Sequence, residues 1–132
     1  MGGYLYIDSS ALIRMATGDH DGPGLKKLAY EYRGNGYQWV SSRLLEMECR
    51  RTAIRLAKEG RGDQQIDEWV KEFDLLPMTE EVWARAMNIE QNIKTLDALH
   101  LATASLVPDC VLLTSDQNMK TVAKALDIKL AA

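Results

Sequence analysis

Long apolar runs are missing from this sequence. No stretch approaches the roughly 18 consecutive apolar residues that a membrane-spanning helix needs. The amino-terminal residues also lack a basic segment followed by an apolar run, which is the pattern of a secretory signal. We therefore expect a cytoplasmic protein that is neither exported nor embedded in a membrane.

Cysteine and net positive charge are scarce as well. The two cysteines, Cys49 and Cys110, lie far apart and form no CxxC pair. This usage argues against a disulfide scaffold or a cysteine-based zinc site and predicts reduced, partly buried thiols. Because the formal net charge is -3, a nucleic acid could be bound only through a local basic patch and not through bulk charge.

What the sequence does contain is typical of one globular domain. It has 132 residues, of which 46% are hydrophobic and 27% charged, so we expect a single domain over residues 1–132. β-prone runs alternate with helical patterns, which indicates a parallel sheet with helices on both faces. The predicted fold class is a three-layer α/β/α fold with a central, mainly parallel sheet of four to five strands.

The boundaries of the elements follow from apolar periodicity and from capping residues. The predicted strands are residues 4–7, 37–40, 73–77, 111–114 and 128–130. The predicted helices are residues 9–15, 25–32, about 41–58, 64–72, 80–92, 96–106 and 116–126, with a loop at 18–24. We expect Ser41 or Ser42 to open the third helix, Thr79 to cap the fifth and Thr95 to cap the sixth.

Three aspartates stand at positions where a parallel sheet places ligands. Asp8 ends the first predicted strand, Asp116 follows the fourth, and Asp97 leads a helix that is otherwise nearly all apolar. Each has a structural explanation by itself, since an aspartate can cap a helix or favour its first turn. Together they are expected to converge, because ligands bind beyond the carboxyl ends of the strands.

A group of carboxylates needs a compensating charge, because the negative side chains repel one another and raise one another's pKa. A hard divalent cation is the natural compensator. Oxygen ligands favour Mg²⁺ or Mn²⁺, and the sequence has no histidine and cysteine set with zinc spacing. We therefore predict a Mg²⁺ or Mn²⁺ site formed by Asp8, Asp97 and Asp116.

Three segments that contain these aspartates resemble the PIN-domain ribonucleases, in particular the VapC-like toxins. The segments are residues 6–12 (YIDSSAL), 95–104 (TLDALHLATA) and 113–116 (LTSD). The second is the most specific of the three, whereas an apolar strand followed by Asp-Ser-Ser is common. The resemblance extends from Tyr4 to about Leu130.

The resemblance implies a fourth acid on the helix after the second strand. Glu48 matches best, with Ser42 before it and Arg51 three residues later, and Glu46 is the alternative. Asn118 stands where many relatives have a further acid, so any help from that position would be weaker here.

Polar residues beside the acids have expected supporting roles. Ser9 and Thr114 resemble hydroxyl positions of the family that could orient a carboxylate or a metal-bound water, although each could simply cap a helix or form a turn. His100 lies in a buried helix, so we expect it to hydrogen-bond within the core and not to act as a catalytic base.

Basic residues gather on the third helix and at its exit. They are Arg50, Arg51, Arg55, Lys58 and Arg61. Such a run is often only a solvated helix face, and Glu59 dilutes it. We interpret Arg50, Arg51 and Arg55 as candidate contacts for an RNA backbone or for an acidic partner.

The function implied by the resemblance is a Mg²⁺- or Mn²⁺-dependent endoribonuclease that is the toxin of a toxin–antitoxin pair. Its partners would be an RNA substrate, a cognate antitoxin and a second copy of the chain. Two other functions stay open: a non-catalytic RNA-binding or assembly module, and an aspartate-based phosphotransferase or phosphatase with Asp8 as nucleophile. The last usually needs a second aspartate two residues on, where this sequence has Ser10.

Overall fold

Five parallel strands form the central sheet of the computed structural model, which describes residues 2–132. The strands are β1 (Tyr4–Ile7), β2 (Gln38–Ser42), β3 (Asp74–Leu76), β4 (Cys110–Leu113) and β5 (Lys129–Leu130). Their order across the sheet is β3-β2-β1-β4-β5, so β1 is central and β3 and β5 are the edges. Every neighbouring pair is parallel.

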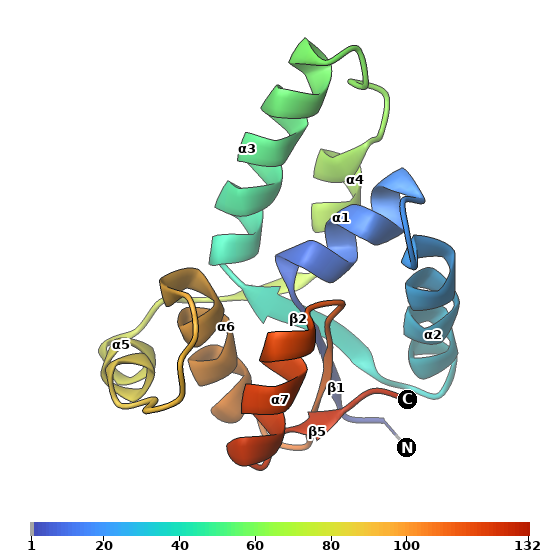
Figure 1. The fold of residues 1–132 in the computed structure, drawn as a ribbon. Coiled ribbons are helices and arrows are strands. Elements are labelled where there is room, and N and C mark those ends of the chain that lie inside the picture. The colour runs from blue at the N-terminus through green and yellow to red at the C-terminus, as the bar shows by residue number, and fades with distance from the viewer. Residues whose placement is uncertain (1) are drawn as a thin grey trace.

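Helices cover both faces of this sheet (Figure 1). They are α1 (Ser9–Thr17), α2 (Gly22–Gly34), α3 (Leu44–Lys58), α4 (Ile66–Val70), α5 (Glu80–Met87), α6 (Thr95–Ser105) and α7 (Gln117–Ala125). Residues of α1 to α4 join one core cluster, and residues of α6 and α7 join another on the opposite face. Figure 1 shows α3 extending past the sheet with α4 beside it.

The pleat of the strands explains this division. Successive side chains of a strand point to opposite faces, and Leu5 and Ile7 of β1 lie in the first cluster whereas Tyr6 lies in the second. All three are fully buried, as the apolar runs of a central parallel strand require. The predicted three-layer α/β/α class and the five-strand sheet are confirmed.

The strand order places a topological switch beside β1. The chain proceeds from β1 to β2 and β3 on one side, and later to β4 and β5 on the other. In such sheets the connections leave opposite faces at the switch and open a crevice beyond the carboxyl ends of the strands. Ile7 is paired with Leu113 at this point, so the segments that follow β1 and β4 start side by side.

The prediction that Ser41 or Ser42 opens the third helix was wrong. Both serines belong to β2, where they pair with Leu75 and Leu76 of β3, and the helix begins at Leu44. Ser42 still resembles a cap, since its hydroxyl accepts a hydrogen bond from the Leu44 N–H at 3.1 Å. Strand pairing across the sheet, which local sequence does not reveal, decides the boundary.

Other helix limits also differ from the predictions. The loop expected at 18–24 ends early, because α2 starts at Gly22 and Pro23 sits in the first turn, where its missing N–H costs nothing. The helix expected at 64–72 shrinks to α4, since Gln65 has a left-handed φ of 56°.

The fifth and sixth helices differ from the predictions as well. Thr79 caps α5 as predicted by accepting the Val82 N–H at 3.2 Å. The helix then ends at Met87, where the Asn88 side chain donates to the Ala84 carbonyl at 2.9 Å. Thr95 is the first residue of α6 and not its cap, because Lys94 takes that position.

Both cysteines are free thiols, as expected, with Cys49 buried and Cys110 partly buried. Burial raises the pKa of each to about 12, which keeps them protonated and unreactive.

Within residues 2–132, no helix combines the length and the apolar character that crossing a bilayer requires.

Two leucines of α6 test this account of the core. Leu101 is fully buried and Leu96 is 45% exposed. We expect Leu101→Ala to lower the free energy of unfolding by about 2–5 kcal/mol, because it leaves a cavity between α6 and the sheet. The matched control Leu96→Ala should change it by less than about 0.5 kcal/mol. Denaturant titration measures both, and equal losses would contradict the assigned packing.

Candidate acidic site at the carboxyl edge of the sheet

Asp8 and Asp116 follow the two central strands and cap the helices that come next. The Asp8 carboxylate accepts the Ala11 N–H at 3.0 Å at the start of α1. The Asp116 carboxylate accepts the Met119 N–H at 3.0 Å at the start of α7. Both aspartates therefore cap a helix and also lie beyond the carboxyl end of a strand, as expected. The two roles coincide because these helices begin at the edge of the sheet.

Asp8 is held by donors on every side. Its Oδ1 accepts hydrogen bonds from the Ser10 hydroxyl and the Ala11 N–H, both at 3.0 Å. Its Oδ2 accepts a short hydrogen bond from the Thr114 hydroxyl. The residue is only 2% exposed, and burial raises the pKa of the carboxyl although these hydrogen bonds lower it. Asp8 is therefore a rigid carboxylate whose charge is not fully compensated.

Glu48 lies on α3 and is held in a different way. Its Oε1 accepts the Ser9 hydroxyl at 2.6 Å and lies 2.7 Å from His100 Nε2. Burial raises the pKa of Glu48, but the hydrogen bonds from His100 and Ser9 outweigh that effect and leave the pKa below its ordinary value. Glu46 points elsewhere, since its side chain is exposed and pairs with Arg43 at 3.9 Å.

Asp97 joins these acids from the first turn of α6. Burial raises its pKa, and the charges of Asp116, Asp8 and Glu48 raise it further. The charge of His100 lowers the pKa, but by less than burial and the other acids raise it. The fold thus brings four acids that are distant in the sequence within electrostatic range of one another.

Few positive groups compensate this charge. Over residues 2–132, the ion pairs of Lys and Arg involve none of the four acids, and His100 is the sole basic neighbour that pairs with Glu48. The donor set is all oxygen, which fits Mg²⁺ or Mn²⁺. The uncompensated charge on Asp8 and Asp97 fits a divalent cation as well.

The described residues do not form a ready-made cage. No three His, Cys, Asp or Glu side chains among residues 2–132 lie close enough together to enclose an ion. Mg²⁺ does not need such a cage, because it commonly keeps several waters and binds through one or two carboxylates plus substrate phosphate. Asp8, Asp97 and Asp116 as a metal set therefore stay a prediction.

The basic residues of α3 are partly engaged. Arg50 pairs with Asp67 at 3.3 Å and Arg55 with Glu59 at 3.4 Å. Arg51 is exposed, and within the described chain it takes part in no ion pair. Arg51 and Arg55 line a shallow surface depression together with Lys58.

Two side chains near the acids were not singled out from the sequence. Ser10 donates to Asp8 and accepts from Ser115 at 3.1 Å, which ties the segments after β1 and β4 together. Tyr6 was interpreted only as a strand residue, yet its hydroxyl lies 2.6 Å from His100 Nδ1. Its polar group in an otherwise apolar run was the available signal. Asn118 donates to the Asn92 carbonyl at 3.2 Å on the surface.

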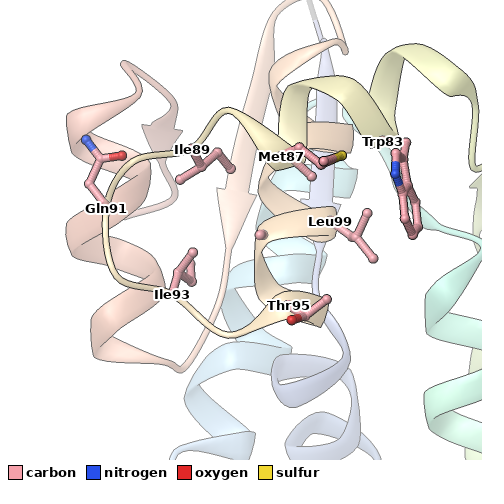
Figure 2. Close-up of a pocket in the computed structure, with 9 residues that line it drawn as sticks. Trp83, Met87, Ile89, Gln91, Ile93, Thr95 and Leu99 are labelled. Carbon is pink, nitrogen blue, oxygen red and sulfur yellow. The ribbon is translucent and has the colours of Figure 1, made fainter.

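A separate apolar pocket of about 260 Å³ lies between α5, α6 and the loop that joins them (Figure 2). Figure 2 shows Trp83, Met87, Ile93 and Leu99 around it. None of the four acids lines this pocket. This pocket and the acidic edge of the sheet are therefore separate features of the surface.

Comparisons with known proteins agree with the fold. A family model described as PIN domain matches residues 5–125. A chain of a toxin–antitoxin complex from Klebsiella pneumoniae superposes with a TM-score of 0.65 at 22% identity and covers 86% of both chains. A chain of VapBC2 from Rickettsia felis bound to a DNA fragment from their promoter superposes at 0.70 with 12% identity and 96% coverage of both. PAE2754 from Pyrobaculum aerophilum superposes with a TM-score of 0.62 at 19% identity, and the match covers 96% of both chains. No curated protein matches significantly in sequence.

Charge crowding at Asp97 predicts that its neutralisation stabilises the protein. Because the pKa of Asp97 is raised in the folded state, its ionisation opposes folding, and stability falls as the pH rises above the ordinary value of 3.8. We expect Asp97→Asn to raise the Tm at pH 7 by roughly 2–4 °C and to have little effect near pH 3. Thermal unfolding followed by circular dichroism measures this.

Asp63→Asn is the control, since Asp63 is exposed in a loop and should leave the Tm unchanged at both pH values. A lower Tm for Asp97→Asn than for the wild type at pH 7 would show that Asp97 is not under electrostatic repulsion.

Proposed function

The chain belongs to the PIN domain family, and on that premise we propose that it is a Mg²⁺- or Mn²⁺-dependent endoribonuclease. The proposed catalytic residues are Asp8, Glu48, Asp97 and Asp116. One observation carries the proposal: Asp8, Glu48 and Asp116 all raise the pKa of Asp97, although the four acids come from four separate segments. Burial and repulsion make the ionised form of Asp97 unfavourable in the folded state, which is expected where a site serves function at the expense of stability.

The cation supplies two things when it is bound: positive charge that stabilises the phosphodiester transition state, and acidification of the attacking water. Asp97 and Asp116 would hold it at the open side of the site, and Asp8 from the buried side. Thr114 orients Asp8 through the hydrogen bond to Oδ2, and Ser9 orients Glu48 through the bond to Oε1. Both contacts of Glu48 go to Oε1, so Oε2 can accept a proton from water.

The basic face of α3 would hold the RNA backbone. Arg51 follows Glu48 by three residues on the same helix, so the two side chains lie on neighbouring parts of its surface. Arg50 and Arg55 form surface ion pairs, which are weak and can exchange for phosphate contacts. These arginines also suit an acidic segment of a protein partner.

The fold neighbours support a proposed role as the toxin of a toxin–antitoxin pair. Two of them are a toxin–antitoxin complex and a VapBC2 complex. We propose that this chain likewise has a cognate antitoxin, that it forms a homodimer, and that it works in the cytoplasm. A small DNA-binding protein encoded immediately upstream would support this, and its absence from the neighbouring genes would count against it.

The catalytic assignment predicts the effect of two neutral substitutions. Asp97→Asn and Glu48→Gln should each reduce Mn²⁺-dependent RNA cleavage by more than about 100-fold, beyond the 10- to 100-fold typical of losing an outer partner of a metal site. Cleavage of a labelled RNA pool by protein purified identically for each variant measures the loss.

The matched controls Glu46→Gln on the same helix and Asp63→Asn should stay within about twofold of wild type, since both side chains are exposed and outside the cluster. Calorimetry should detect Mn²⁺ binding to wild type and not to Asp97→Asn. Full activity of Asp97→Asn would refute the proposal. RNA binding without cleavage by the wild type would favour a non-catalytic module, and phosphate trapped on Asp8 would favour a phosphotransferase.

The assignment of Arg51 predicts a different kinetic signature. Arg51→Ala should raise KM for RNA several-fold with little change in kcat, because a phosphate contact binds substrate and transition state alike. The dependence of log K on log salt should become shallower by roughly 0.7 for a single-stranded substrate. Lys27→Ala on the exposed face of α2 is the control. An unchanged salt dependence in Arg51→Ala would place the RNA elsewhere.

A further inference from the structure

A buried chain of hydrogen bonds runs from the core of the sheet to the acidic site. Tyr6 of β1 contacts His100 of α6, with 2.6 Å between the phenol oxygen and Nδ1. The other ring nitrogen, Nε2, lies 2.7 Å from Oε1 of Glu48. Tyr6 is fully buried and His100 is 1% exposed. These hydrogen bonds therefore link three elements and lead from two buried side chains to Glu48, whose side chain is 24% exposed.

The donors and acceptors along this chain determine where the ring proton is. The Tyr6 oxygen already accepts the Ser42 N–H at 3.1 Å, so its own proton must be given to an acceptor. The acceptor that the geometry assigns to this proton is His100 Nδ1, at 2.6 Å from the phenol oxygen. A neutral ring that accepts here carries no proton on Nδ1.

An imidazole that accepts at Nδ1 has its proton on Nε2 when it is neutral. That proton points at Glu48 Oε1, which is the acceptor that the geometry requires. The Ser9 hydroxyl donates to the same oxygen at 2.6 Å and lies 3.3 Å from Nε2. This arrangement satisfies the polar atoms of the network, whereas a neutral ring with its proton on Nδ1 would direct the lone pair of Nε2 at the Glu48 carboxylate.

We propose that His100 is a positioning residue for Glu48, held by Tyr6 in the tautomer that donates from Nε2. This inference rests on the proposed nuclease function, to which it assigns an additional residue. By fixing Oε1, His100 and Ser9 set the direction of the free Oε2. His100 also lies one turn after Asp97 on the same face of α6, so this helix carries one acid of the site and orients a second.

Two amide substitutions separate this role from simple core filling. The side-chain nitrogen of Gln reaches about as far as Nε2 of histidine, whereas that of Asn reaches only as far as Nδ1. We expect His100→Asn to lower kcat for RNA about 10- to 100-fold with KM within about twofold, a loss similar to that on removing a hydrogen-bond partner that orients a metal-site residue. His100→Gln restores the donor and should bring kcat back to within a few-fold of wild type.

The Tm of each variant is measured together with its kcat. If the role of His100 were purely structural, the loss of activity would parallel the loss of stability. Equal kcat in His100→Asn and His100→Gln, whether unchanged or equally reduced, overturns the positioning role. So does a loss of activity in His100→Asn that disappears at a temperature well below its Tm.

The tautomer is tested without any activity assay. Long-range ¹H–¹⁵N NMR of the wild type at neutral pH should show His100 protonated at Nε2 and unprotonated at Nδ1. Glu48→Gln should shift the Nε2 resonance, and Glu46→Gln should not. A proton on Nδ1, or an equal response to both variants, overturns the proposal. Because this readout needs no substrate, a wild type that cleaves no RNA would refute the nuclease function alone and leave the hydrogen-bond assignment to be decided by NMR.

Discussion

Repulsion among carboxylates at one edge of the sheet is the constraint on which the rest of this structure depends. Asp97 is disfavoured as an anion by its own burial and by the charges of Asp116, Asp8 and Glu48. Several polar side chains hold the acids in place in spite of this unfavourable energy. Thr114 donates a hydrogen bond to Asp8, and Ser9 and His100 contact Glu48. Such an arrangement is expected where function opposes stability.

The parallel sheet makes this convergence possible with ordinary local devices. Asp8 follows β1 and Asp116 lies three residues after β4, and each caps the next helix. Ile7 pairs with Leu113, and the Thr114 hydroxyl donates to Asp8 and accepts the Asp116 N–H, so the two caps lie at the same part of the sheet edge. A residue that satisfies the first turn of a helix is thereby also directed at the crevice beside the topological switch. Capping and site formation are one geometry here, which is why neither aspartate can be assigned to one role alone.

The two faces of the sheet contribute differently to the site. On one face, α1 and α3 supply Ser9 and Glu48, and on the other, α6 supplies Asp97 and His100. The hydrogen bonds of His100 to Tyr6 and Glu48 join the layers at the point where the acids meet. Packing of α6 through Leu101 in the core therefore governs the relative positions of the acids as well as stability.

Local patterns in the sequence determined the element order, the fold class and the acidic positions. The apolar runs 4–7 and 111–114 predicted the central strands, and Asp8, Asp97 and Asp116 stood out because acids at strand ends and in an apolar helix are unusual.

What local sequence could not decide depends on contacts between distant segments. Ser41 and Ser42 look like helix caps, yet pairing with β3 makes them strand residues. Glu48 differs from Glu46 only through the rotation of α3, which packing decides. His100 was expected to be satisfied in the core, and only the tertiary structure connects it to an acid 52 residues away, because hydrogen bonds between elements follow from how the layers stack and not from the spacing of residues along one chain segment.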